Sequence, residues 1–164
     1  MPRKKPTKKR MRRRLDDVCR IYVNKRDLAT CQTCGIHRDS TKLGSLDWSH
    51  YISRRHTIVR WDQRNWLAQC RKCHQQYGDG INGPLINAIN RIWGEGTTEL
   101  LEKTASQTPT IKGTLLDLVD YRMSLEQYFK DLIHSLDNGI SPEECMKTSC
   151  PSLGEEQPEK ENIL

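Results

Sequence analysis

This sequence contains little apolar material and no long apolar run. Hydrophobic residues make up 35% of its 164 residues, with a single phenylalanine, whereas an ordinary globular domain has roughly 45–50%. No segment approaches the ~20 consecutive apolar residues that a membrane-spanning helix needs, so we expect no membrane association. The first fourteen residues lack the apolar region of a secretory signal. We therefore expect a cytoplasmic protein with a modest core.

Cysteine is also too scarce for a disulfide scaffold. The chain has seven cysteines, an odd number. Without a secretory signal, this number favours a reducing compartment, where closely spaced cysteines more often bind metal than form disulfides.

Charge is distributed unevenly along the chain. The net charge is +6, yet residues 1–14 carry nine basic and no acidic residues, and residues 141–164 carry six glutamates against two lysines. Runs of like charge repel themselves, so we expect a disordered basic arm over 1–14, a folded domain over 15–140 and a disordered acidic tail over 141–164. The arm suits DNA phosphates, although a solubilising tail or a localisation signal has the same composition. Its candidate DNA contacts are Lys4, Lys5, Arg12 and Arg13.

Hydrophobic spacing predicts helices on both sides of a small centre that contains strands. From Leu15 onward, apolar residues recur with the 3.6-residue period of a helix. Pro84 suits the first turn of a second helix, which we expect to stop at Gly94. Asn138-Gly139 is a natural end for the last helix. The fold class is therefore α+β. The expected helices cover 15–27, 82–93, 97–103 and 112–136, and the expected strands cover 46–51 and 65–69.

Two C-x-x-C turns carry the strongest signal in the sequence. They are Cys31-x-x-Cys34 and Cys70-x-x-Cys73. Two such turns can present four thiolates tetrahedrally to one zinc ion, and Gly35 suits the tight turn of the first. Redox pairs and buried free cysteines are the alternatives, but a redox C-x-x-C normally opens a helix in a thioredoxin-like unit, which we do not find. We predict a structural four-cysteine zinc site with no open position for catalysis.

Three polar residues lie between and just after these turns. His50 is on the first expected strand, Asn65 opens the second, and His74 directly follows the last zinc cysteine. Phosphodiester hydrolysis needs a base near the operating pH and a cation for the charge on the phosphoryl and leaving oxygens. A His, an Asn and a His in a two-C-x-x-C frame resemble the HNH, or ββα-metal, nucleases.

The resemblance extends to one family of that superfamily. The chain is similar to the phage NinG, or Rap, recombination endonucleases over about residues 15–137. This resemblance implies a zinc-stapled ββα-metal centre with a long C-terminal helix. It also implies a phage-encoded enzyme of the host-cell cytoplasm that nicks Holliday junctions or D-loops. The similar segments are Val23-Asn24-Lys25-Arg26-Asp27, Ser49-His50-Tyr51 followed by Arg54, Arg64-Asn65 before Gln69-Cys70, and the helix 85–93 with Gly94.

The same resemblance assigns a role to each polar residue. His50 is the general base, Asn65 holds the hairpin loop in shape, and His74 is a ligand of a catalytic Mg²⁺ or Mn²⁺. The family pattern is Asp-x-Gly-His-Tyr, and Ser49 stands where it has glycine. Many HNH enzymes carry a second metal ligand just before the base, a role that suits serine poorly. Asp47 is our candidate, but positions i and i+3 of a regular strand face opposite sides, so it can join His50 only if the strand bends.

Each of these residues also has a purely structural interpretation. His50 would also fit as a core histidine, His74 as a surface residue and Asp47 as a turn residue. The loop between the strands offers further candidate DNA contacts, or is simply solvated: Arg54, Arg55 and Arg60. The aromatic residues near these positions fit a small core better than a base-stacking platform: Trp48, Tyr51, Trp61 and Trp66.

Three functions therefore fit the sequence. The first is a metal-dependent endonuclease that nicks branched or structured DNA. An alternative nuclease function is cleavage of linear duplex DNA, as in packaging or restriction, but the chain lacks the added DNA-reading module that this would favour. The second is a catalytically inert, zinc-stabilised DNA-binding module. The third is a structural protein whose long C-terminal helix contacts a partner or forms a homodimer. The joint presence of His50, Asn65 and His74 favours the nuclease.

Overall fold

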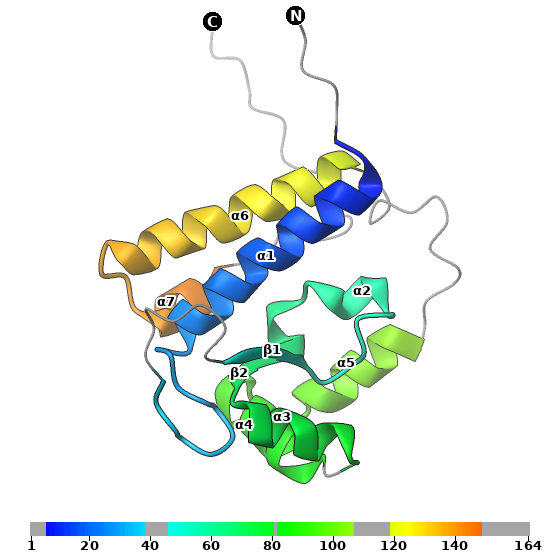
Figure 1. Cartoon of the computed structure of the whole chain (residues 1–164), viewed down its shortest axis with the longest axis vertical. Coiled ribbons are helices and arrows are strands. Elements are labelled where there is room, and N and C mark those ends of the chain that lie inside the picture. The colour runs from blue at the N-terminus through cyan, green and yellow to red at the C-terminus, as the bar shows by residue number, and fades with distance from the viewer. Residues whose placement is uncertain (1–5, 39–45, 81, 107–118, 149–164) are drawn as a thin grey trace, which may run out of the picture.

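A two-stranded antiparallel sheet lies at the centre of a mixed α+β, mostly helical fold (Figure 1). The computed structural model describes residues 6–38, 46–80, 82–106 and 119–148. The strands are β1 (Asp47–His50) and β2 (Trp66–Gln69), inside the two segments expected from the sequence. The helices are α1 (Lys8–Arg26), α2 (Thr57–Arg60), α3 (Arg71–Gly78), α4 (Gly83–Trp93), α5 (Thr97–Ser106), α6 (Val119–Asp137) and α7 (Pro142–Lys147), with a 3₁₀ turn η1 (Gln63–Asn65).

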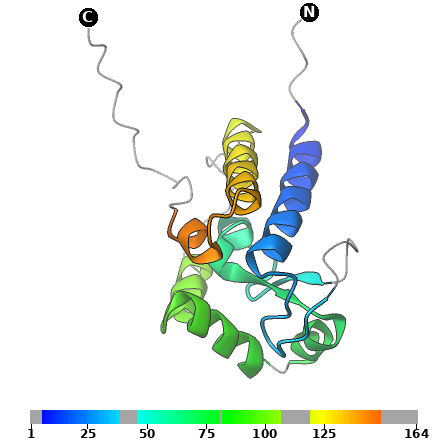
Figure 2. The ribbon, with the colours of Figure 1, turned by 90° about the vertical axis from the view of Figure 1, so that its left-hand side faces the viewer.

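The helices α1 and α6 lie side by side and run in the same direction (Figures 1 and 2). Polar contacts join them near the start, where Arg14 Nη2 lies 2.8 Å from Glu126 Oε1, and at the end, where Lys25 pairs with Asp137. The apolar face of α6, which the sequence left open for a partner, is therefore largely covered by α1. One buried cluster contains the facing side chains Leu15, Cys19, Tyr22, Leu125 and Phe129.

The first helix begins earlier than its apolar spacing predicted. It starts at Lys8 rather than Leu15, and the Thr7 hydroxyl caps it by accepting the Arg10 N–H at 3.3 Å. Met11 and Leu15 are both fully buried, so the apolar face extends one turn into the basic segment. Residues 8–14, expected to be disordered, are therefore helical, because buried Met11 continues the apolar face of Leu15 and Cys19 into an otherwise charged segment.

The expected acidic tail also begins with ordered structure. Ser141 and Glu144 form a capping box at the start of α7, in which each side chain accepts the other residue's backbone N–H. Cys145 on this helix is buried against the main core. The predicted boundary at residue 140 thus lies before the last described helix rather than after it.

The helix ends predicted from proline and glycine are confirmed at Pro84, Gly94 and Gly139. The helix α4 starts after Asn82, has Pro84 in its first turn, and ends at Gly94, whose φ of 98° favours glycine. The last long helix ends at Asp137, just before Gly139 (φ 86°), whereas its expected start near residue 112 lies outside the described residues.

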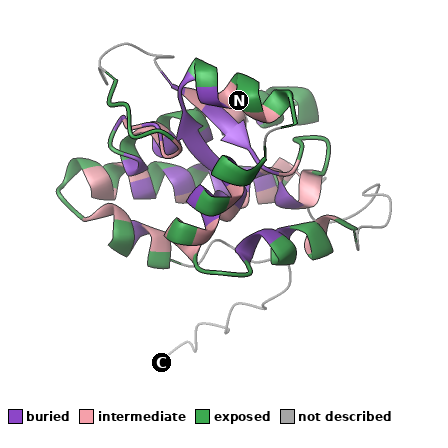
Figure 3. Ribbon diagram, turned by 90° about the horizontal axis from the view of Figure 1, so that it is seen from below, coloured by how far each residue is buried: buried purple, intermediate pink, exposed green. Residues whose placement is uncertain are grey.

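Burial is greatest around the sheet. Figure 3 shows buried strands at the centre and exposed outer faces on the surrounding helices. One cluster lies between the sheet and α1 with α6, and includes Trp48, Trp61 and Trp66, so these aromatics are core residues, as expected. A second cluster joins Tyr51 and Leu67 to α4 and α5. Among the described helices, none is both long and apolar enough to cross a membrane.

Candidate zinc centre and hairpin-loop site

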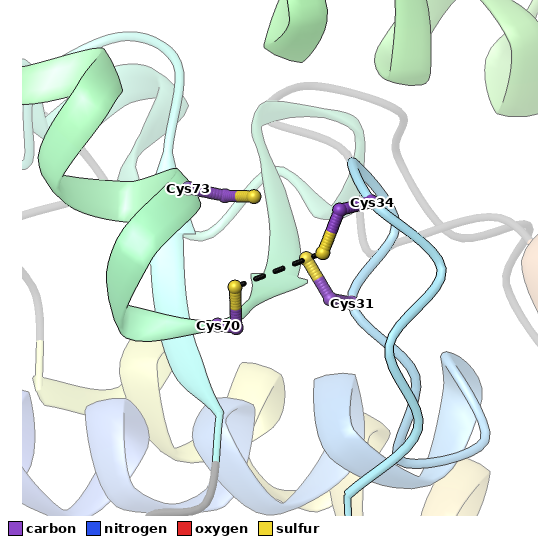
Figure 4. A group of neighbouring side chains, drawn as sticks. All are labelled: Cys31, Cys34, Cys70 and Cys73. Carbon is purple, nitrogen blue, oxygen red and sulfur yellow. Dashed lines mark hydrogen bonds between the residues drawn. The ribbon is translucent and has the colours of Figure 1, made fainter.

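The fold brings both C-x-x-C turns together (Figure 4). Cys31 and Cys34 lie in the turn after α1, and Cys70 and Cys73 lie at the start of α3. All four sulfurs lie within 4.8 Å of one another, and the Cys34 and Cys70 sulfurs are 3.8 Å apart. Tetrahedral zinc, with Zn–S bonds of about 2.3 Å, separates its sulfur ligands by about 3.8 Å. The four cysteines therefore fit one structural zinc ion.

Backbone hydrogen bonds hold the first cysteine turn against the sheet. The Gly35 N–H donates to the Cys31 carbonyl at 2.8 Å, and Gly35 has a φ of +74°, which glycine adopts without strain. The Gln32 N–H donates to the Ala68 carbonyl on β2 at 2.9 Å. The first turn is thus fixed to the strand that leads directly to the second pair of cysteines.

The electrostatics of the four thiols also fit a bound cation. Burial alone would raise the pKa of Cys31, but hydrogen bonds from the backbone at Cys70, Cys34 and Thr33 lower it to about 7. Burial raises the pKa of Cys73. Four thiolates this close repel one another in a low-dielectric site unless a positive charge lies between them. A divalent cation supplies that charge, so the donor chemistry agrees with the geometry.

Asn65 closes the loop that joins the two strands. Its side chain is fully buried, with Oδ1 accepting the Ile52 N–H at 2.7 Å. Its Nδ2 donates to the carbonyls of Ile52 at 3.1 Å and Val59 at 2.8 Å. These bonds join the start, middle and end of the loop, which is the geometry that a loop-holding asparagine requires.

His50 lies at the end of β1 with a fixed ring orientation. It is 7% exposed, stacks edge-on against Trp48 with ring centres 4.2 Å apart, and places Nε2 3.1 Å from the Arg60 carbonyl. A carbonyl oxygen only accepts, so Nε2 carries the proton and Nδ1 is left as the acceptor. Burial, with a contribution from the charges of Arg54 and Arg60, lowers the pKa of His50 to about 3, although backbone hydrogen bonds with Arg60 and Trp48 act in the opposite direction. The ring is neutral at pH 7.

Asp47 does not lie on the same side of β1 as His50. The strands pair in regular register from Asp47 opposite Gln69 to His50 opposite Trp66, so the bend required to bring Asp47 and His50 together is missing from the sheet. Asp47 instead faces α3, where its Oδ2 lies 2.9 Å from His74 Nδ1. At this distance the two side chains are hydrogen-bonded to each other, so a cation bound by both would replace that hydrogen bond.

The described residues do not assemble a complete second metal site. Among them, the four cysteines are the only group of three or more His, Cys, Asp or Glu side chains whose ligand atoms come together. The Asp47–His74 pair is about one-third exposed, which leaves the remaining positions of a cation open to water. Ser49 lies on the same side of β1, and its buried Oγ has no hydrogen-bond partner within the described part of the chain.

The predicted DNA contacts divide into free and occupied residues. Arg60 is occupied, because its guanidinium donates to both Asp16 oxygens at 3.1 and 2.6 Å and to the Arg54 carbonyl at 2.8 Å. Its side chain is only 13% exposed, so it is poorly placed to contact a phosphate. Lys4 and Lys5 lie outside the described residues. The exposed members of the predicted set are Arg12, Arg13, Arg54 and Arg55.

A buried ion pair that the sequence left without a role lies behind the same loop. Arg26 and Asp27 are 2% and 6% exposed, and Arg26 donates to the carbonyls of Gln63 and Trp66, on either side of Asn65, at 3.0 Å each. Asp27 Oδ2 accepts an N–H from β2 at 2.7 Å. From the sequence, both residues belong only to the segment 23–27 that resembles the NinG family, and neither is given a role.

The chain was also compared with known proteins. No protein-family model matches it, and neither a curated protein nor a solved structure matches it. Assignment to the HNH nucleases is therefore a proposal, which depends on the residues and contacts of the hairpin-loop site, formed by His50, Arg60 and Asn65.

Proposed function

We propose that this protein is a zinc-stapled HNH-type endonuclease that nicks branched or structured DNA by phosphodiester hydrolysis. The observation that carries the proposal is the His50 ring, whose Nε2 donates to the Arg60 carbonyl in a loop closed by Asn65. Fixing one ring nitrogen as a donor makes Nδ1 the acceptor for a proton from water. A histidine that served only the core would satisfy its buried N–H in the same way, so cleavage by His50 variants is the measurement that separates the two roles.

The electrostatic surroundings of His50 set its strength as a base. A ring with a pKa of about 3 is neutral at pH 7 but accepts a proton weakly. A phosphodiester brought next to Nδ1 carries a negative charge, which raises the pKa of a nearby imidazole toward the operating pH. DNA would thus strengthen the base that acts on it.

Asp47 and His74 are the residues that would hold a catalytic Mg²⁺ or Mn²⁺. Such a cation would balance the charge that develops on the phosphoryl and leaving oxygens. The pair is 2.9 Å apart and partly open to solvent, and the orphaned Ser49 hydroxyl shares its side of β1. The pair lies at the opposite end and on the opposite side of β1 from His50, so a cation held there and the His50 ring do not face one phosphodiester in this arrangement. Variants of the pair are therefore tested separately from those of the base.

The exposed arginines on α1 and in the loop after β1 would bind DNA phosphates. Arg12 and Arg13 lie on the part of α1 adjacent to Asp16, and Asp16 contacts the loop that carries Arg54 and Arg55. Phosphate contacts of this kind position the duplex without reading its sequence. They favour recognition of DNA structure over recognition of a long sequence.

An inert zinc-stabilised DNA-binding module is the second candidate. It is favoured by the near-complete burial of His50 and by the lack of a third ligand beside Asp47 and His74 among the described residues. Such a protein would bind DNA with the same arginines and would keep the zinc, but would not cleave.

Cleavage of a synthetic four-way junction and of a linear duplex of matched sequence, with Mg²⁺ or Mn²⁺, separates these candidates. The wild type should nick the junction preferentially, and His50→Ala should be at least about 100-fold slower with unchanged zinc content. His134→Ala, which changes an exposed histidine on α6, is the matched control and should cleave normally. Binding without cleavage by the wild type would establish the inert module, and full activity of His50→Ala would refute the mechanism.

His74→Ala should lose activity in a different way. Loss of a ligand weakens the metal site, so raising Mn²⁺ should recover part of the rate in His74→Ala and little in His50→Ala. Asp47→Asn should behave like His74→Ala if Asp47 is a ligand. Near-wild-type cleavage by Asp47→Asn would show that its pairing with His74 is only structural.

A further inference from the structure

Asp16 on α1 contacts both side chains that flank one peptide group of the loop. Its Oδ2 accepts from Arg60 Nη2 at 2.6 Å, and its Oδ1 accepts from Arg60 Nε at 3.1 Å and from Trp61 Nε1 at 3.0 Å. The peptide between Arg60 and Trp61 carries the carbonyl that lies 3.1 Å from His50 Nε2. One carboxylate therefore holds both sides of the group that orients the histidine.

This carbonyl depends on side-chain contacts for its position. It belongs to the last residue of α2, a helix of a single turn, and such short helices have little stability of their own. Carbonyls at a helix end have no partner within the helix, and His50 supplies the partner here. Further contacts also hold α2: Arg60 Nη1 donates to the Arg54 carbonyl, Asn65 Nδ2 donates to the Val59 carbonyl, and Val59 packs in the cluster with α4 and α5.

The ion pair is shielded enough for its geometry to matter. The side chains of Arg60 and Asp16 are 13% and 16% exposed, and the Arg60 guanidinium lies over the Trp61 ring, 5.6 Å from its centre. Two charge-assisted hydrogen bonds from one guanidinium to one carboxylate fix direction as well as distance. The sequence predicted a DNA-binding role for Arg60, whereas this pairing assigns it to holding the loop against α1.

We propose that Asp16 is a positioning residue for His50. By fixing the Arg60–Trp61 peptide, it keeps the carbonyl on Nε2 and so maintains the tautomer in which Nδ1 is the acceptor. Its effect on catalysis depends on the proposed nuclease function, whereas its effect on the ring of His50 does not. Asp16 acts through Arg60 and Trp61 and makes no contact with DNA in this role.

Two simpler roles for Asp16 make different predictions. A purely structural ion pair between α1 and the loop would lower stability when broken but leave the tautomer of His50 unchanged. In a purely electrostatic role, Asp16 would act only as a negative charge among arginines. Asp16→Asn would then increase DNA affinity and change nothing else. The tautomer of His50 is the quantity that neither of these roles would alter.

Long-range ¹H–¹⁵N NMR of the histidine rings tests the proposal on full-length, zinc-loaded protein at pH 7. The wild type should show a single Nε2–H form of His50, and Asp16→Asn should show a mixture of tautomers. Arg60→Gln breaks the same pair from the other side, keeps the backbone carbonyl, and should give the same result. Asp137→Asn, which breaks the ion pair of α6 with Lys25, is the matched control and should leave His50 unchanged.

The outcomes separate positioning from catalysis. In single-turnover nicking, Asp16→Asn should lower the rate, by up to roughly 100-fold for a displacement of 1 Å, with equal or tighter junction binding. A wild-type Nε2–H signal in either folded variant would overturn the positioning role, and so would failure of both variants to fold, which would assign the pair to stability alone. A changed tautomer in a protein that never cleaves DNA would refute the nuclease and leave the positioning intact.

Discussion

Replacing Asn65 by alanine should destabilise the protein far more than a typical asparagine substitution. The change deletes three hydrogen bonds, of 2.7, 3.1 and 2.8 Å, from a fully buried side chain. It leaves the Ile52 N–H and the carbonyls of Ile52 and Val59 without that partner. An unsatisfied buried group costs about 1–3 kcal/mol.

The position of each orphaned group sets the expected magnitude. Val59 is fully buried, so its carbonyl would gain no water and would keep only the backbone N–H groups of Trp61 and Asp62 as donors, whereas Ile52 is half-buried and its groups would recover part of their hydration. We therefore expect a total near the low end of the sum, about 3 kcal/mol. For a protein of this size that corresponds to a fall in Tm of roughly 6–12 °C.

Urea unfolding followed by tryptophan fluorescence, at a fixed free zinc concentration, measures this cost. Asn138→Ala is the matched control, because that exposed side chain also donates to a carbonyl, that of His134, and its loss should cost less than about 0.5 kcal/mol. Asn65→Asp should be at least as damaging as Asn65→Ala, since it places a second acceptor against two carbonyls. A cost below about 1 kcal/mol for Asn65→Ala, or wild-type stability of Asn65→Asp, would refute the reasoning.

Three further predictions concern the zinc, the DNA surface and pH. Cys70→Ser should lower the zinc content, measured by mass spectrometry, from one equivalent per chain, because one of four thiolate ligands is lost; native protein without zinc would contradict the site. Replacing Arg12 and Arg13 together by Gln should reduce the slope of log affinity against log salt by about 1.8, since each lost phosphate contact contributes about 0.9; an unchanged slope would show that neither contacts DNA. His50 has a folded-state pKa of about 3 against 6.5, so between these values the unfolded chain binds more protons and stability falls as pH falls, by up to about 1.4 kcal/mol per unit. His50→Gln should remove that dependence in unfolding experiments at pH 6.5, 5 and 4, and parallel curves for the two proteins would contradict it.

The parts of this structure that the sequence predicted are those governed by local chemistry. Cysteine spacing identified all four sulfurs of the zinc centre, because a C-x-x-C turn positions its two thiols by itself. Pro84 and Gly94 marked the ends of α4 because each restricts the backbone wherever it occurs. Asn65 was identified by resemblance, and its bonds to Ile52 and Val59 were visible only in the folded chain.

The parts that the sequence did not predict depend on contacts between distant segments. Arg60 looked like a phosphate contact because a loop arginine is usually solvated, and only the folded chain shows that Asp16 on α1 is its partner. Asp47 looked like a companion of His50, and the regular register of the sheet instead gave it to His74. The start of α1 was misplaced because nine basic residues outweighed the single apolar signal of Met11.

Different interactions stabilise the two ends of the sheet, so the cysteine site and the orientation of His50 depend on different parts of the fold. A two-stranded sheet has little stability alone. Where Asp47 pairs with Gln69, the sheet meets the cysteines at the start of α3, and His74 follows them directly. At the other end, where His50 pairs with Trp66, hydrogen bonds of Asn65 and the Asp16–Arg60 ion pair hold the loop that joins the strands. If the four cysteines bind zinc, we expect its removal to release α3 and the Asp47–His74 pair first, because the orientation of His50 depends on α1 and the loop.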